Sequence, residues 1–141
     1  MRQKIVRDYP PNYDRICRAF GVAGKRGIVF SWGDRLYVPD GDIVPAQLAA
    51  HEAVHGERQV GDIEGWWRRY MDDADFRLAE ELLAHRAEYD WLMSGNRRQR
   101  RGALKATAER LAAPLYGPMC SVTEARALLR SPFLTPLELA G

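Results

Sequence analysis

The residues at positions 51–55, HEAVH, place two histidines and a glutamate at a spacing that suits metal chemistry. Pro45 opens an alanine-rich stretch, so the sequence predicts a helix over residues 45–58 with proline at its first position. In a helix, residues four apart differ by about 40° of rotation and about 6 Å of rise. His51 and His55 therefore project from one face, and both imidazoles can bind one zinc ion.

Glu52 lies beside this face. Its carboxylate can take a proton from a zinc-bound water molecule and deliver it to a leaving amine, which is the chemistry of peptide hydrolysis. A shuffled chain of this composition would contain the HExxH pattern only about 0.003 times. The alternative is a pair of surface histidines on an amphipathic helix. The uncharged neighbours Ala49, Ala50, Ala53 and Val54 favour a helix packed inside the domain instead.

Two histidines do not complete a catalytic zinc site, which usually has three protein ligands and keeps its fourth position for water. The metzincin pattern would place glycine at position 58 and histidine at position 61. The chain has Arg58 and Gly61 there, which excludes that class. The remaining candidate ligands are acidic residues or the third histidine, and they cluster in a long helix predicted to begin near three capping aspartates and to end near Met93.

Glu81, His85 and Glu88 share one face of that predicted helix. Glu80 points about 100° away from Glu81, so we expect it to face solvent. On a helical wheel of this segment, we rank Glu81 first as the candidate for the third metal ligand, followed by Glu88 and then His85. A carboxylate or histidine on this face could also hold an imidazole N–H instead of binding the metal.

HEAVH, followed later in the chain by ELLA at positions 81–84, resembles the gluzincins, whose third zinc ligand is a glutamate in an ExxA setting. Smaller bacterial and phage proteins of this type carry a WGD-x-x-Y-x-P hairpin before the motif and HExxH-x-x-x-Q within it. The chain matches these features at Trp32, Gly33, Asp34, Tyr37, Pro39 and Gln59. The resemblance covers roughly residues 27–92.

The resemblance implies a zinc ion held by His51, His55 and Glu81, with Glu52 as general base. It also implies a compact zincin-like domain in which a small sheet precedes the active-site helix. It does not identify a group that stabilises the oxyanion of the reaction, for which Tyr70, Tyr89 and His85 are candidates.

Periodicity predicts an α+β domain that is mainly helical. We expect a short strand near residues 3–7 and an antiparallel hairpin of residues 27–31 and 35–38. Helices are expected over residues 13–20, 45–58, from about 72 to 93, 97–113 before Pro114, and from the capping pattern at 121–124 to about 130. The segment 64–70 is predicted to be a connector, with Trp66 and Trp67 in the core rather than in a substrate pocket.

The 141 residues fit one domain, residues 1–141, and the net charge of +2 gives no reason to expect nucleic acid as a partner. There is no apolar run long enough to span a membrane and no apolar leader, so we expect a cytoplasmic protein without membrane contact. Cys17 and Cys120 form no metal-binding or disulfide pattern. We expect the basic run 97–101 to be a solvated helix start.

The sequence thus predicts a zinc-dependent metallopeptidase that hydrolyses a peptide or protein. The same atoms could hydrolyse an amide bond in a cell-wall compound or another small molecule. A rival from a different class is a binding or assembly protein that keeps the zincin scaffold. In that case the metal would be structural or absent, and the basic run would contact nucleic acid or a protein.

Overall fold

Three short strands near the N-terminus form one mixed sheet in the computed structural model, which describes residues 1–41, 43–113, 119–136 and 138. The predicted hairpin is present but shorter, as β2 (Phe30–Trp32) and β3 (Arg35–Tyr37). β1 (Lys4–Val6) pairs with β3 in parallel. The strand order is β1-β3-β2, so β2 lies at an edge of the sheet.

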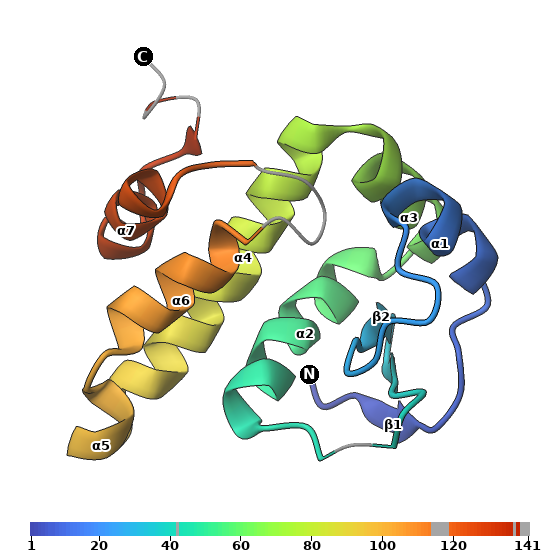
Figure 1. The fold of residues 1–141 in the computed structure, drawn as a ribbon, viewed down its shortest axis with the longest axis horizontal. Coiled ribbons are helices and arrows are strands. Elements are labelled where there is room, and N and C mark those ends of the chain that lie inside the picture. The colour runs from blue at the N-terminus through green and yellow to red at the C-terminus, as the bar shows by residue number, and fades with distance from the viewer. Residues whose placement is uncertain (42, 114–118, 137, 139–141) are drawn as a thin grey trace.

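Helices make up most of the described chain, which confirms the prediction of a mainly helical fold with a small sheet. They are α1 (Tyr13–Phe20), α2 (Ala46–Gln59), α3 (Ile63–Asp72), α4 (Ala74–Met93), α5 (Arg97–Arg100), α6 (Ala103–Leu111) and α7 (Val122–Arg130). Figure 1 shows α2 between the sheet and α4. No helix in the described ranges is both long and apolar enough to cross a membrane.

Two apolar clusters flank the contact between α2 and α4. One joins the sheet to α1 and α3 and includes Ile16, Phe30 and Trp67. The other joins α4, α6 and α7 and includes Leu82 and Leu128. Burial of these side chains stabilises the domain on both sides, and the polar residues of the α2–α4 contact lie between the two clusters.

The predicted connector at 64–70 is wrong, because these residues belong to α3. Asp62 caps this helix by accepting a hydrogen bond from the backbone N–H of Gly65 at 2.9 Å. Trp66, Trp67 and Tyr70 are all buried. Tryptophan and tyrosine are only average helix formers, so the helix depends on burying these rings, which is a tertiary effect.

Two other helix predictions need correction. The helix predicted over 97–113 is interrupted at Gly102, whose φ of 73° does not fit a right-handed helix, so α5 and α6 are separate. Pro114 lies outside the described residues. Pro45 is the N-cap of α2 rather than its first helical residue. The arginines of the 97–101 run are exposed and form no ion pair within the described part of the chain.

The hairpin turn is held against the last turns of α2. The Gln59 side chain accepts a hydrogen bond from the backbone N–H of Gly33 at 2.7 Å and donates one to the Ser31 carbonyl at 3.2 Å. At Gly56 the two backbones come so close that an added Cβ would clash with the carbonyl oxygen of Gly33. This close approach fixes the distance between the hairpin and the HExxH residues.

Gly56→Ala is therefore expected to lower the free energy of unfolding by about 1–3 kcal/mol through overpacking, although helix propensity alone favours alanine. The measurement is urea unfolding followed by circular dichroism. Ala49→Gly, at an exposed position of α2, is the matched control for propensity and should cost about 1 kcal/mol. Equal or greater stability of Gly56→Ala would contradict the close approach.

Candidate metal centre

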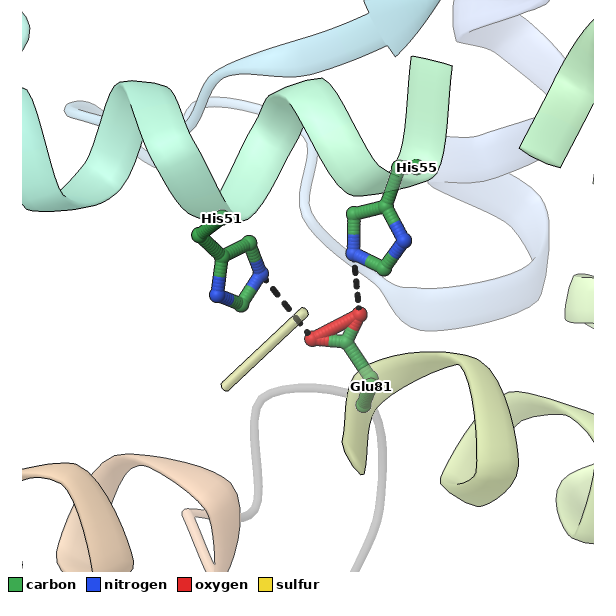
Figure 2. Close-up of side chains that lie close together, drawn as sticks. All are labelled: His51, His55 and Glu81. Atoms are coloured by element: carbon green, nitrogen blue, oxygen red, sulfur yellow. Dashed lines mark ion pairs between the residues drawn. The ribbon is translucent and has the colours of Figure 1, made fainter. Parts of the chain in front are cut away.

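His51 and His55 project from one face of α2 toward Glu81 on α4, as the spacing predicts (Figure 2). The Nε2 atom of His55 lies 2.7 Å from one carboxylate oxygen of Glu81. The Nε2 atom of His51 lies 3.5 Å from the other oxygen. Ligand atoms of these three residues all lie within 4.8 Å of one another. The two helices thus bring together both HExxH histidines and Glu81, the candidate that was ranked first as the third ligand.

The other two candidates for the third ligand are at the same place. His51, His85 and Glu88 form a second group whose ligand atoms also lie within 4.8 Å of one another. All of these side chains are buried. The Glu88 carboxylate lies 2.7 Å from the guanidinium of Arg110 on α6. Both groups share His51, so the geometry alone does not limit the site to one set of ligands.

The electrostatics of the site favour the ionised form of Glu81. Burial opposes its charge, but the charge of His55 and hydrogen bonds from His51 and His55 hold the pKa of Glu81 well below its usual range. Burial also opposes the charge of His51. The hydrogen bond and charge of Glu81, helped by the charges of Glu52 and Glu88, nevertheless raise the pKa of His51 to about 9. The carboxylate is therefore compensated by a proton on its neighbour.

The donor set fits a zinc ion. Zinc is bound by imidazole nitrogen and carboxylate oxygen, and both Nε2 atoms face oxygens of one carboxylate, His51 at 3.5 Å and His55 in direct contact at 2.7 Å. The Nδ1 atoms of His51 and His55 are buried and have no hydrogen-bond partner among the described residues. Buried polar atoms without a partner are rare in folded proteins and need a specific explanation. A cation on Nε2 would fix the tautomer in which Nδ1 carries the ring proton.

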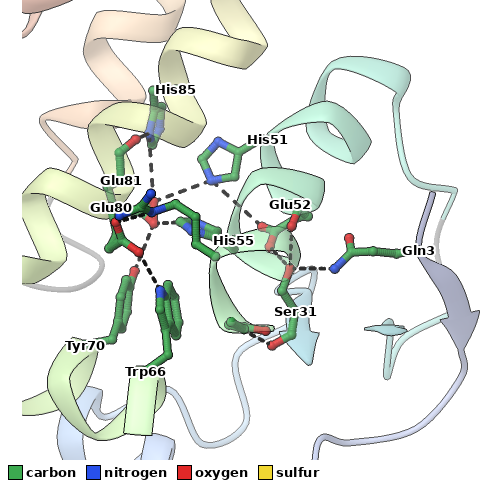
Figure 3. A network of polar contacts seen from close by, with 12 residues as sticks. Gln3, Ser31, His51, Glu52, His55, Trp66, Tyr70, Glu80, Glu81 and His85 are labelled. Carbon is green, nitrogen blue, oxygen red and sulfur yellow. Dashed lines mark hydrogen bonds and ion pairs between the residues drawn. The ribbon is translucent and has the colours of Figure 1, made fainter. Parts of the chain in front are cut away.

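Glu52 lies on the sheet side of the histidines and is held by Ser31 of β2 (Figure 3). The Ser31 hydroxyl lies 2.7 Å from one carboxylate oxygen of Glu52. Gln3 donates a hydrogen bond to that hydroxyl at 3.2 Å, and the single serine proton can go either to this carboxylate oxygen or to the backbone carbonyl of Glu52 at 2.9 Å. The other carboxylate oxygen of Glu52 lies 3.9 Å from Nε2 of His51. One oxygen is thus anchored, and the other faces the metal ligands.

The prediction that Glu80 faces solvent is wrong, because it is only 2% exposed. It accepts hydrogen bonds from Arg58 of α2 and from the indole of Trp66 of α3, both at 2.6 Å. A helical wheel gives the direction of a side chain but not what lies in that direction. Here α2 and α3 supply two donors, so Glu80 links three helices instead of binding metal.

A cavity of about 330 Å³ opens over the site. Trp66, Trp67 and Tyr70 line it and also pack in the core, so the two interpretations of the tryptophans are compatible. Other residues of its wall are Ile28, Val29, Leu48, Leu111 and Met119. This wall is mainly apolar, which excludes water from part of the site and strengthens the electrostatic interactions within it.

The three candidates for oxyanion stabilisation differ in position. Tyr89 packs with the α4–α6–α7 cluster and is not part of the cavity wall. The Tyr70 hydroxyl donates a hydrogen bond to Glu81 at 3.1 Å, so it orients that carboxylate. Nδ1 of His85 lies 2.7 Å from the backbone carbonyl of Glu81, which can only accept. Burial, followed by the charge of His51, lowers the pKa of His85 to about 3, so its Nε2 carries no proton to donate.

Sequence reasoning missed the roles of Ser31, Gln3 and Arg110. Ser31 lies in a predicted strand, where a polar residue among apolar ones is a weak sign of a function. Nothing in the sequence connects Arg110 or Gln3 with the HExxH motif.

Cys17 and Cys120 are free and half-buried.

No family model, curated protein or solved structure matches the chain. The resemblance to gluzincins therefore stays a prediction, and the function has to be argued from the site itself.

The protonated His51 gives a prediction for the metal-free protein. Its pKa is about 9 in the folded state against 6.5 for an ordinary histidine, so its contribution to stability is complete below pH 6.5 and is lost as the pH rises through about 9. Urea unfolding in the presence of a chelator should show wild type losing its stability advantage over Glu81→Gln between pH 7 and pH 10. An advantage that stays constant across this range would contradict the pairing.

Proposed function

We propose that the protein is a zinc-dependent metallopeptidase with a zincin-like site, in which His51, His55 and Glu81 hold the ion. The observation that carries this proposal is the convergence of both Nε2 atoms on one buried carboxylate at the floor of a cavity. The anchored Glu52 beside them is the further element that a hydrolytic site needs and a purely structural metal site does not.

Zinc bound at such a site lowers the pKa of a coordinated water molecule and polarises the carbonyl group of a substrate. The protein residues hold and orient the metal ligands. His51 and His55 keep their imidazoles toward the cavity because they lie one helical turn apart. Glu81 reaches them from the neighbouring helix, and Tyr70 holds its carboxylate in place.

Glu52 is proposed to transfer the protons. Ser31 fixes one carboxylate oxygen, so the other is presented to the site with little freedom. That oxygen accepts a proton from the attacking water. The neutral carboxyl group then donates the proton to the leaving nitrogen as the C–N bond breaks, which returns Glu52 to its ionised form.

A peptide is favoured over a small amide by the position of the site beside an edge strand. Ile28, Val29 and Ser31 line the cavity, and β2 has no partner strand on its outer side within the described sheet. The Ser31 carbonyl already accepts hydrogen bonds from Gln59 and Trp67, so an extended peptide would add through main-chain hydrogen bonds to the segment of Ile28 and Val29 that precedes β2, while its side chains enter pockets. The apolar wall around Trp66 suits an apolar side chain next to the scissile bond.

Glu52→Gln tests the proposed general base. It should reduce the cleavage of a quenched-fluorophore casein at least about 100-fold, because a positioned acid–base group contributes 10²- to 10⁴-fold, while bound zinc measured by mass spectrometry stays the same. Glu57→Gln, at an exposed position of the same helix, is the control and should retain activity. Undiminished cleavage by Glu52→Gln, or none by zinc-loaded wild type, would reject the proposal and favour a binding protein.

Ser31→Ala tests the positioning of Glu52. Losing a hydrogen bond to a charged group should lower kcat roughly tenfold, with KM and zinc content nearly unchanged. Ser31→Thr keeps the hydroxyl and should recover part of the loss. If Ser31→Ala instead raises KM at constant kcat, the hydroxyl contributes to substrate binding and not to the orientation of Glu52.

A further inference from the structure

A second cluster of metal-binding side chains lies directly beside the proposed zinc site. His85 and Glu88 are neighbours on one face of α4, and their ligand atoms lie within 4.8 Å of one another and of His51. His85 is 6% exposed and Glu88 is 3% exposed. Two histidines and a carboxylate form a ligand set that divalent transition metals accept. The proposed mechanism assigns no role to His85 or Glu88.

The hydrogen bonding of His85 leaves a nitrogen available for a cation. Its Nδ1 lies 2.7 Å from the backbone carbonyl oxygen of Glu81. A carbonyl has no proton to give, so Nδ1 must carry the hydrogen and Nε2 must carry the lone pair. Histidine ligands of metals characteristically donate their other N–H to a carbonyl or carboxylate in this way. The ring is therefore held in the tautomer that a metal ligand requires.

The Glu88 carboxylate is oriented in a comparable manner. Arg110 of α6 lies 2.7 Å from its Oε2, yet this buried oxygen has no hydrogen-bond partner among the described residues, so the carboxylate keeps an unsatisfied oxygen that a cation could bind. Ligating carboxylates are commonly held by a second partner. Arg110 thus places a positive charge beside this buried carboxylate.

His51 is common to both ligand sets, and an imidazole has two nitrogens. Its Nε2 lies 3.5 Å from Glu81, whereas its Nδ1 is buried without a hydrogen-bond partner among the described residues. Binding one cation at each nitrogen requires the ring to lose both protons. Among the described residues, the cavity wall also contains Glu52, Glu81 and Glu88 against one guanidinium, that of Arg110, and one divalent cation already neutralises that excess. A second cation should therefore bind more weakly than the first.

We propose that His85 and Glu88, together with His51, form a second divalent-cation site adjacent to the proposed catalytic one. The inference rests on the proposed function in one respect: it takes His51, His55 and Glu81 as the ligands of the first and tighter zinc site. It makes the cavity a two-metal pocket with one shared histidine, in which the ligands of each ion lie on α2 and α4.

Equilibrium dialysis of the full chain against increasing free zinc, with bound zinc counted by mass spectrometry, tests the proposal. Wild type should bind two zinc ions in a tight and a weaker step. His85→Gln and Glu88→Gln should each lose only the weaker ion, and His55→Ala only the tight one. His51→Ala should affect both steps. Glu80→Gln changes a buried glutamate of the same helix that belongs to neither set, and it should keep both ions.

The outcomes separate the two proposals. Wild type that saturates at one zinc, lost in His55→Ala, would overturn the second site and leave the proposed function standing. One zinc that is lost in His85→Gln and Glu88→Gln but kept in His55→Ala would overturn both. Circular dichroism and urea unfolding of each variant establish that a lost ion is not the result of a lost fold. Cobalt added in steps gives an independent readout, because each occupied site has its own absorption spectrum.

Discussion

The structure depends on how the buried charge of Glu81 is compensated. An isolated carboxylate in a protein interior costs several kcal/mol, which only well-placed partners recover. Here the partners are two imidazoles from the neighbouring helix: the charge of His55 and hydrogen bonds from both rings lower the pKa of Glu81, and Glu81 in turn raises the pKa of His51. A divalent cation would serve the same purpose with more charge and better geometry. Protons and metal therefore compete for one place between α2 and α4, and the same interaction joins the helices and defines the chemistry.

The rest of the fold keeps those two helices at the required distance. On one side, Gln59 and the close approach at Gly56 hold the hairpin against α2, and Ser31 of the edge strand reaches Glu52. On the other side, Glu80 of α4 is bound by Arg58 of α2 and Trp66 of α3. Polar contacts of this kind are directional, so they fix the register between elements where apolar packing alone would tolerate sliding. Precise placement of a few side chains is what a catalytic site requires.

Much of the site could be predicted because its parts are local. HExxH on a helix fixes the relative position of His51 and His55 whatever the rest of the chain does, and the wheel that placed Glu81, His85 and Glu88 on one face uses the same helical geometry. What the sequence could not provide is the environment of each face. Glu80 was assigned to solvent because the approach of α3 was unknown, and α3 itself was missed because it is stabilised by buried aromatic rings. The parallel pairing of β1 and the contributions of Ser31 and Arg110 likewise arise only when distant segments meet.

The most direct measurement of the central claim is a crystal structure of the zinc-loaded protein with anomalous diffraction recorded at the zinc edge. The account predicts an anomalous peak about 2.0–2.2 Å from Nε2 of His51, from Nε2 of His55 and from a carboxylate oxygen of Glu81, with the cavity on its open side. A structure in saturating zinc that shows no peak at this place, and the Glu81 carboxylate still bound directly to His55, would contradict it.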